Sequence, residues 1–240
     1  MLHPAISRYD GTVQSWQELL GAAKSGAFGA SEAGRSIAWR VFLGLLPCHR
    51  PISSWQASVD QSRERYHALK AEHIPDFSKS QGDPLADSLS TGDGNCSLGG
   101  AKGEAEGDGG KPTVWSVYYQ MADLRAEIKR DLTRLFVDGT PTEDHFFAPQ
   151  RQQLLLTVLY LWSRLHYPSP SYRQGMHELL APILFALEAD AVALRSASTE
   201  GGTASEEWHG LCPDWDSSES TLEADCFAMF EALMNDLEPW

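Results

Sequence analysis

SYRQGMHELLAPILFAL, residues 171–187, is the stretch that decides the fold. Its apolar residues recur at helical spacing, which predicts a helix with one buried face: Met176, Leu179, Leu180, Ile183, Leu184 and Leu187. Gln174 and Gly175 stand in what we expect to be its first turn, and Pro182 is expected to kink it because proline lacks a backbone N–H. Inside a helix, glycine costs about 1 kcal/mol relative to alanine, and it is tolerated where a partner must approach the backbone. A buried helix with a polar start is a candidate site; the alternative is a core helix whose Gln174 only caps it or faces water.

Helical periodicity also dominates the rest of the chain. We expect helices over residues 15–23 and 35–47, where Pro47 ends the run, and a longer helix that Ser53 caps. Further helices are predicted from residue 114, over 124–133 with Asp123 as its cap, over 150–166 and over 222–237. No stretch keeps the alternation of a strand, so the predicted fold class is all-α.

Two segments do not have this periodicity. Residues 1–12 are expected to be a loose lead-in to one domain, residues 13–240. Within that domain, residues 78–112 hold nine glycines, several serines and few apolar groups. Such a segment cannot offset its ordering entropy by burial, so we predict a disordered insert. Residues 196–218 are polar, and we expect them to be mobile.

The charge of the chain excludes several kinds of partner. Among 240 residues the net charge is -14, and from Ser196 onward there are eleven acidic residues and no Lys or Arg. A nucleic-acid backbone requires clustered cations, so we expect no nucleic-acid partner, and an anionic membrane surface is disfavoured as well. The longest apolar run, residues 179–187, is too short to span a bilayer.

The cysteines and the N-terminus suggest where the protein functions. Its four cysteines contain no CxxC pair, which favours reduced thiols over a disulfide framework or a zinc site. The first residues contain no apolar core of a signal peptide. We therefore expect an intracellular protein without a metal of its own.

Three motifs, taken in order, resemble those of the TBC domain, the helical domain of Rab GTPase-activating proteins. They are Arg35-x-x-x-Trp39-x-x-x-Leu43-Gly44, Ile128-x-x-Asp131-x-x-Arg134 and Tyr172-x-Gln174-Gly175-Met176. The run from Tyr172 to Ile183 and the run from Asp225 to Trp240 are similar to the branch of that family associated with the endosomal retromer coat. The resemblance covers most of residues 13–240 outside the glycine-rich insert.

The resemblance implies a mechanism with two residues inserted in trans. Arg134 would enter the active site of a Rab-family small GTPase and neutralise charge on the transferring phosphoryl group, and Gln174 would position the attacking water. Phosphoryl transfer depends on such electrostatic stabilisation and positioning rather than on covalent catalysis. The protein would then be a GTPase activator rather than an enzyme with its own substrate. It would have no cofactor of its own, and the Rab would carry the GTP and Mg²⁺.

Each supporting residue also has a structural interpretation. Asp131 either orients Arg134 or makes a surface ion pair with it, worth a few tenths of a kcal/mol. Gly175 supports the motif, Tyr172 is expected to pack rather than react, and Arg35 and Trp39 are assigned to folding. His177 is expected to point away from Met176 and to bind no metal. Lys129 and Arg130 are read as solvated residues that could steer a phosphate-bearing partner.

The chain departs from the family in two respects. The family usually has Thr and Pro after the arginine, whereas here Arg134 is followed by Leu135, Phe136 and Val137. The family's domain continues with further helices, so we expect the chain to be a fragment or a truncated form that holds the N-terminal part of the domain.

The resemblance also implies a second partner and a location. In the retromer-associated branch, an insert at this place carries a Pro-Leu pair that binds retromer, and Pro84 and Leu85 stand at the matching position. Membrane trafficking and autophagy at endosomes, by a cytoplasmic protein peripheral on endosomal membranes, are the expected setting. The alternative function is a non-catalytic binding module that recruits the retromer coat.

Overall fold

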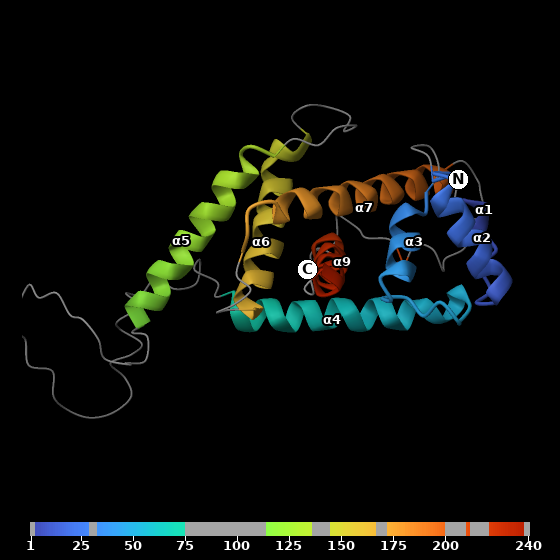
Figure 1. Cartoon of the computed structure of the whole chain (residues 1–240), viewed down its shortest axis with the longest axis horizontal. Helices are drawn as coiled ribbons and strands as arrows, with labels where there is room; N and C mark the ends of the chain where they lie inside the picture. Colours follow the sequence, from blue (N-terminus) through green and yellow to red (C-terminus); the bar gives the residue numbers. More distant parts are fainter. Residues whose placement is uncertain are drawn as a thin grey trace, which may run out of the picture.

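A computed structural model describes residues 3–28, 33–74, 114–135, 145–166, 172–199, 210–211 and 221–237. Its helices are numbered as in Figure 1. In chain order they are α1 (Pro4–Ser7), α2 (Val13–Lys24), α3 (Arg35–Phe42), α4 (Trp55–His73), α5 (Val114–Leu132), α6 (Pro149–Leu165), α7 (Met176–Thr199) and α9 (Thr221–Leu237), with 3-10 turns at Ile52–Ser54 and His145–Phe147. The described residues contain no strand, so the all-α prediction is confirmed for them.

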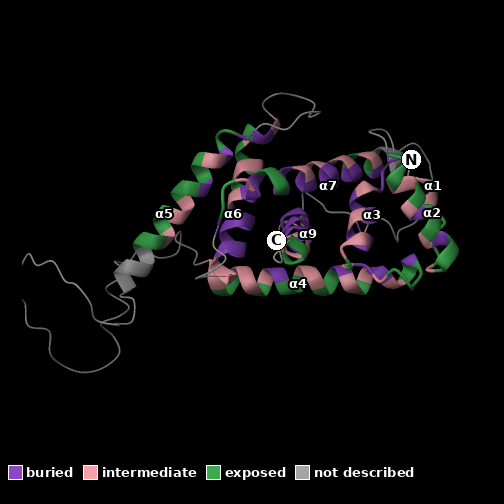
Figure 2. Cartoon of the chain, in the orientation of Figure 1, coloured by how far each residue is buried: buried purple, intermediate pink, exposed green. Residues whose placement is uncertain are grey.

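Helix α9 lies at the centre of the fold. Figure 1 shows it end-on inside a frame made by α4 along one side, α7 along the other, and α6 and α3 between them. It contacts α4, α6 and α7. Nine consecutive residues, Leu222 to Phe230, are buried, and Figure 2 shows buried residues on the part of α9 that faces the surrounding helices. A helix that is buried on all sides needs partners for its polar groups, and α9 carries two buried carboxylates, Glu223 and Asp225.

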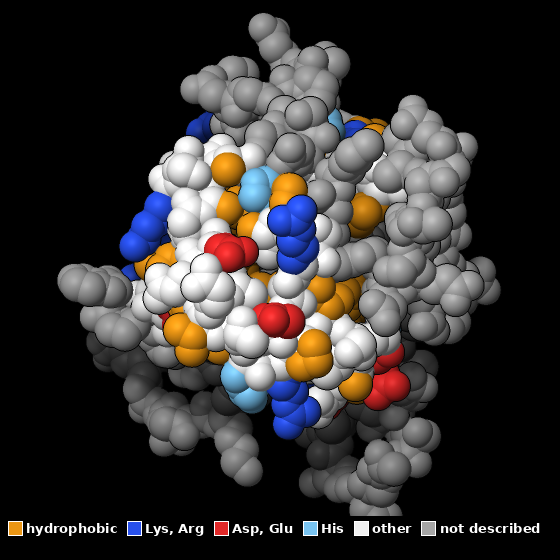
Figure 3. Space-filling model, turned by 90° about the vertical axis from the view of Figure 1, so that its right-hand side faces the viewer, with side chains coloured by type: hydrophobic (Ala, Val, Ile, Leu, Met, Phe, Trp, Pro, Cys, Tyr) orange, Lys and Arg blue, Asp and Glu red, His pale blue; other side chains and the backbone are white. Residues whose placement is uncertain are grey.

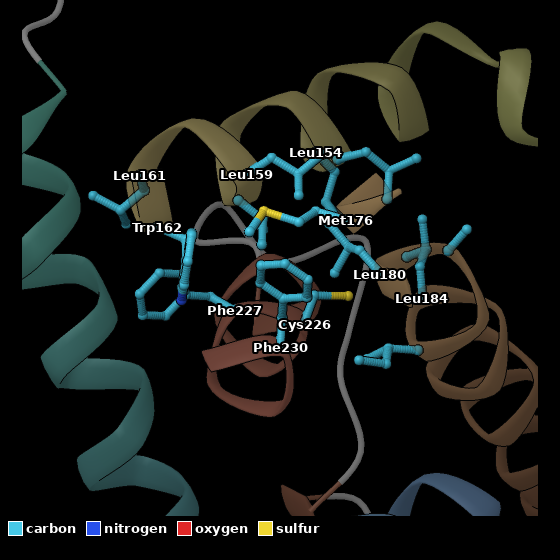
Figure 4. Close-up of a cluster of buried hydrophobic side chains, with 14 of the residues drawn as sticks. Leu154, Leu159, Leu161, Trp162, Met176, Leu180, Leu184, Cys226, Phe227 and Phe230 are labelled. Atoms are coloured by element: carbon cyan, nitrogen blue, oxygen red, sulfur yellow. The ribbon is translucent and has the colours of Figure 1, made fainter. Parts of the chain in front are cut away.

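The main hydrophobic core surrounds α9. Phe227 and Phe230 of α9 lie against Trp162 of α6 and against Met176 and Leu180 at the start of α7 (Figure 4). Burying one such aromatic or aliphatic side chain contributes about 1.5–3 kcal/mol. The same cluster includes Ile128, Leu132 and Leu135, which attach α5 and the residues that follow it to α6 and α7.

A second cluster forms the N-terminal end of the molecule. Ile6 and Tyr9 are buried there with Leu19, Ile37 and Trp55. The expectation of a loose lead-in was therefore wrong for residues 3–12, since α1 packs into the fold. The insert predicted at 78–112 lies outside the described residues, as does most of 196–218.

Several predicted helix boundaries were also wrong. Helix α3 ends at Phe42 rather than at Pro47, because Gly44 takes a φ of 72° that a helix cannot continue. Ser53 does not cap α4, since it lies within the 3-10 turn that precedes it. Asp123 caps nothing, because α5 runs unbroken from Val114 to Leu132.

A carboxylate from α7 caps the N-terminus of α3. Asp190 accepts hydrogen bonds from the backbone N–H groups of Gly34 and Ser36, both at 2.8 Å, and from the Ser36 hydroxyl at 2.6 Å. These bonds satisfy donors that every helix N-terminus leaves open, and the negative charge is favourable there. They also fix α3, and with it Trp39, against α7.

Charge is dispersed over the end of the molecule that α1 and α2 form. Figure 3 shows that end, with the basic and acidic side chains of the described residues scattered among apolar and small ones. The described basic side chains on this face form no continuous cationic patch.

Candidate functional site

Arg134 lies just beyond the last turn of α5. Its backbone N–H donates to the Asp131 carbonyl at 2.9 Å, so the chain is still turning as it leaves the helix. Leu132 and Leu135 on either side are buried, whereas the side chain of Arg134 is exposed. Two apolar anchors thus fix the backbone while the guanidinium extends into solvent, which is the arrangement that a residue acting on a partner requires.

Gln152 of α6 holds this end of α5 in place. Its side-chain amide donates to the Leu132 carbonyl at 3.2 Å and to the Phe146 carbonyl at 2.8 Å. The carbonyl groups in the last turn of a helix have no partner within it, so this contact satisfies one of them. It also ties the backbone two residues before Arg134 to a buried helix.

Gln174 and Gly175 lie in a turn before α7, not in its first turn as predicted. The helix begins at Met176, and the backbone N–H of Glu178 donates to the Gly175 carbonyl at 3.0 Å. Gly175 has a φ of 100°, a conformation that residues with a side chain rarely adopt. The Gln174 side chain is exposed. The glycine is therefore needed for the turn that presents Gln174.

Replacing Gly175 by alanine is expected to lower the free energy of unfolding by about 1–2 kcal/mol, through backbone strain alone. An added Cβ would meet no atom within 4 Å, so crowding makes no contribution. The matched control is Gly21→Ala in the exposed part of α2, where the added Cβ is also unobstructed and φ is ordinary. That change should be neutral or stabilising by up to about 1 kcal/mol. Urea denaturation measures both, and equal effects would contradict the strain at Gly175.

A hydrogen bond between Tyr172 and Asp131 joins the two segments. The Tyr172 hydroxyl donates to Asp131 Oδ2 at 2.9 Å. Asp131 is three residues before Arg134, and Tyr172 is two residues before Gln174. In the described part of the chain Asp131 makes no ion pair with Arg134. Its carboxylate accepts the hydrogen bond from Tyr172 instead. The arginine-bearing and glutamine-bearing segments are therefore brought together at the end of α5 and the start of α7.

The Tyr172 hydroxyl remains protonated. Burial is the largest cause that raises the pKa of Tyr172, and the hydrogen bond to Asp131 and the Asp131 charge raise it further. Glu127 and Glu178 act in the same direction. A tyrosine held neutral in this way is a permanent donor to Asp131, so the bond is expected to persist across the physiological pH range.

His177 belongs to the same group, which the sequence did not predict. It is 5% exposed, and its Nδ1 lies 3.0 Å from the Tyr172 hydroxyl. Sequence analysis missed His177 and Gln152 because neither is part of a spacing pattern, and a histidine five residues after a tyrosine carries no signal without the fold. Only the turn at Gln174 and Gly175 brings His177 back to Tyr172.

The predicted folding roles of Arg35 and Trp39 agree with their contacts. The Arg35 guanidinium donates to the Phe28 carbonyl at 2.6 Å. Trp39 lines a pocket of about 380 Å³ between α3, α7 and α9. The other lining residues are almost all apolar: Phe42, Leu43, Leu179, Pro182, Ile183, Met229 and Leu233, with Glu178. Neither Arg134 nor Gln174 lines this pocket, so it is separate from the candidate site.

Other predicted features lie elsewhere. Pro84, Leu85 and Phe136 are outside the described residues. Within the described part of the chain, no three His, Cys, Asp or Glu side chains gather as a metal site would require. No helix there is both long enough and apolar enough to cross a membrane.

Comparison with known proteins identifies the class. No family model matches the chain. TBC1 domain family member 5 of Mus musculus is 33% identical over 208 residues, which is 86% of this chain and 22% of the relative. The Homo sapiens protein of that name is 31% identical over 207 residues, with the same shares. TBC1 domain family member 5 homolog B of Dictyostelium discoideum is 30% identical over 208 residues, 86% of this chain and 17% of the relative.

Because these relatives are 30–33% identical over 86% of the chain, the chain belongs to the TBC-domain family, and its all-helical fold agrees with that assignment. The chain spans about a fifth of the length of the curated relatives it matches. It is similar to one small part of each.

Proposed function

We propose that this protein activates a Rab-family small GTPase by supplying Arg134 and Gln174 in trans. Arg134 stabilises the charge that develops on the transferring phosphoryl group, because a guanidinium is always charged and binds phosphate oxygens in pairs. Gln174 orients the attacking water with its amide. The protein binds no nucleotide of its own, since the Rab brings GTP and Mg²⁺, and neither residue has to gain or lose a proton.

The hydrogen bond from Tyr172 to Asp131 is the observation that carries the proposal. It ties the backbone near Arg134 to the backbone near Gln174, and both side chains are exposed to a partner. Buried neighbours on each segment, Leu135 and Met176, anchor the site to the core. Similarity to TBC1 domain family member 5 supports the same function.

The finer proposal concerns the partner and the place. We propose an endosomal Rab as the substrate and a peripheral position on endosomal membranes, on the strength of the resemblance described under Sequence analysis. Recruitment of retromer through Pro84 and Leu85 stays a prediction, because both residues lie outside the described part of the chain.

The test is single-turnover GTP hydrolysis by a panel of purified Rabs, with and without the protein. At least one Rab should hydrolyse GTP faster by about 10³-fold or more. Gln174→Ala should remove most of that acceleration, whereas Gln150→Ala, at another exposed glutamine, should leave it unchanged. Acceleration of no Rab, or an equal loss for both variants, would exclude the proposed mechanism.

A further inference from the structure

His177 is a buried polar residue at the beginning of α7. It is 5% exposed, and Met176 before it and Leu180 three residues after it belong to the main core. Burying an imidazole costs free energy unless its nitrogens find partners. Its Nδ1 lies 3.0 Å from the Tyr172 hydroxyl. An apolar side chain could fill this buried position at a lower cost, so the hydrogen bond to Tyr172 is the feature that a histidine adds.

The direction of the two hydrogen bonds follows from the number of protons available. Tyr172 has one hydroxyl proton and donates it to the Asp131 carboxylate, which only accepts. The hydroxyl oxygen must therefore accept from His177, so Nδ1 carries the proton in the neutral ring. The other nitrogen, Nε2, lies 4.0 Å from Glu178 Oε1 at the protein surface.

We propose that His177 is a positioning residue, which holds the Arg134 and Gln174 segments in a fixed relative position through Tyr172 and Asp131. The inference rests on the proposed function for its kinetic consequence, but the geometric part stands by itself. His177 Nδ1–H orients the Tyr172 hydroxyl, and the hydroxyl holds Asp131. The three side chains link the start of α7 to the last turn of α5.

The effect on the reaction comes from geometry. Arg134 and Gln174 are both exposed, so their separation depends on the backbone segments that carry them. A water and a phosphoryl group must be held within a few tenths of an ångström of the reactive arrangement. An unfixed Tyr172 hydroxyl would let the two segments move relative to one another, which lowers the rate in the complex more than it lowers affinity.

The experiment compares His177→Leu with His177→Asn in the full chain. Leucine fills the space without a donor, whereas the asparagine amide places an N–H near the position of Nδ1. We expect His177→Leu to lower kcat for Rab GTP hydrolysis by about 10–100-fold with KM within about twofold, and His177→Asn to restore most of the loss. Tyr172→Phe, which removes both hydrogen bonds and keeps the ring, should reproduce the leucine variant.

A second measurement separates failure of this inference from failure of the proposed function. Spin labels at the exposed positions Thr133 and Arg173, with Cys48, Cys96 and Cys212 replaced by serine, report the separation of the two segments without any Rab. The distance distribution should be narrow for the parent and His177→Asn, and broad for His177→Leu and Tyr172→Phe. A parent that accelerates no Rab excludes the proposed function, while the label distances still decide the positioning. The positioning role of His177 would be overturned if the label distances were unchanged in His177→Leu, or if His177→Leu and His177→Asn lost the same amount of activity.

Discussion

Arg134→Ala is expected to lower the single-turnover rate of Rab GTP hydrolysis by about 10³–10⁵-fold. That loss corresponds to about 4–7 kcal/mol of barrier. The proposed mechanism predicts a large effect because the transferring phosphoryl group spreads negative charge over its oxygens, and Arg134 would supply the opposing charge at no reorganisation cost. Stability should stay within about 0.5 kcal/mol of the parent, since the Arg134 side chain is exposed.

Two further substitutions make this result specific. Arg134→Lys keeps the charge but loses the planar pair of donors, so it should recover only part of the rate. Arg130→Ala removes an exposed cation one turn earlier on α5 and should change the rate by no more than severalfold, through weaker steering of the acidic nucleotide. Equal losses for Arg130→Ala and Arg134→Ala would indicate general electrostatic attraction rather than insertion of one residue.

The sequence predicted the fold class and most helices because their apolar spacing is strong. Helix α6 was expected over 150–166 and runs from Pro149 to Leu165, and α9 was expected over 222–237 and runs from Thr221 to Leu237. Boundaries that depend on a single backbone conformation were missed. Asp123 is a suitable cap residue in isolation, yet burial of Ile128 and Leu132 on one continuous face keeps α5 unbroken.

The candidate site was predictable only in part, for a related reason. Motif spacing indicates Arg134 and Gln174 but not how they are held, because Asp131 and Tyr172 are 41 residues apart and meet only once α5 and α7 have packed. Asp131 has an equally plausible local partner in Arg134, and sequence spacing cannot choose between them. The structure favours the distant partner because a buried hydroxyl needs an acceptor, whereas an exposed guanidinium is satisfied by water.

Every buried polar group needs a partner, and this requirement predicts that the largest loss of stability comes from replacing Asp225 of α9. Its carboxylate is 4% exposed and accepts from two arginines: Arg40 of α3 at 2.8 Å, and Arg63 of α4 at 2.9 and 3.0 Å. Both guanidinium groups also donate to carbonyls of the Gly210–Leu211 segment. The central helix is thus tied to three other parts of the chain through one side chain.

Asp225→Ala is expected to lower the free energy of unfolding by about 3–5 kcal/mol, because it removes the carboxylate that pairs with the buried Arg40 and with Arg63, whose side chain is only 13% exposed. The matched control is Glu231→Ala, since Glu231 is also on α9 and also pairs with an arginine of α4, Arg65, whose side chain is 54% exposed. Because the Arg65 guanidinium stays hydrated when its partner is removed, this change should cost less, about 1 kcal/mol. Urea denaturation of both variants measures the difference. If Asp225→Ala cost no more than Glu231→Ala, Arg40 and Arg63 would have to be hydrated in solution, and Asp225 would not be what ties α9 to α3 and α4.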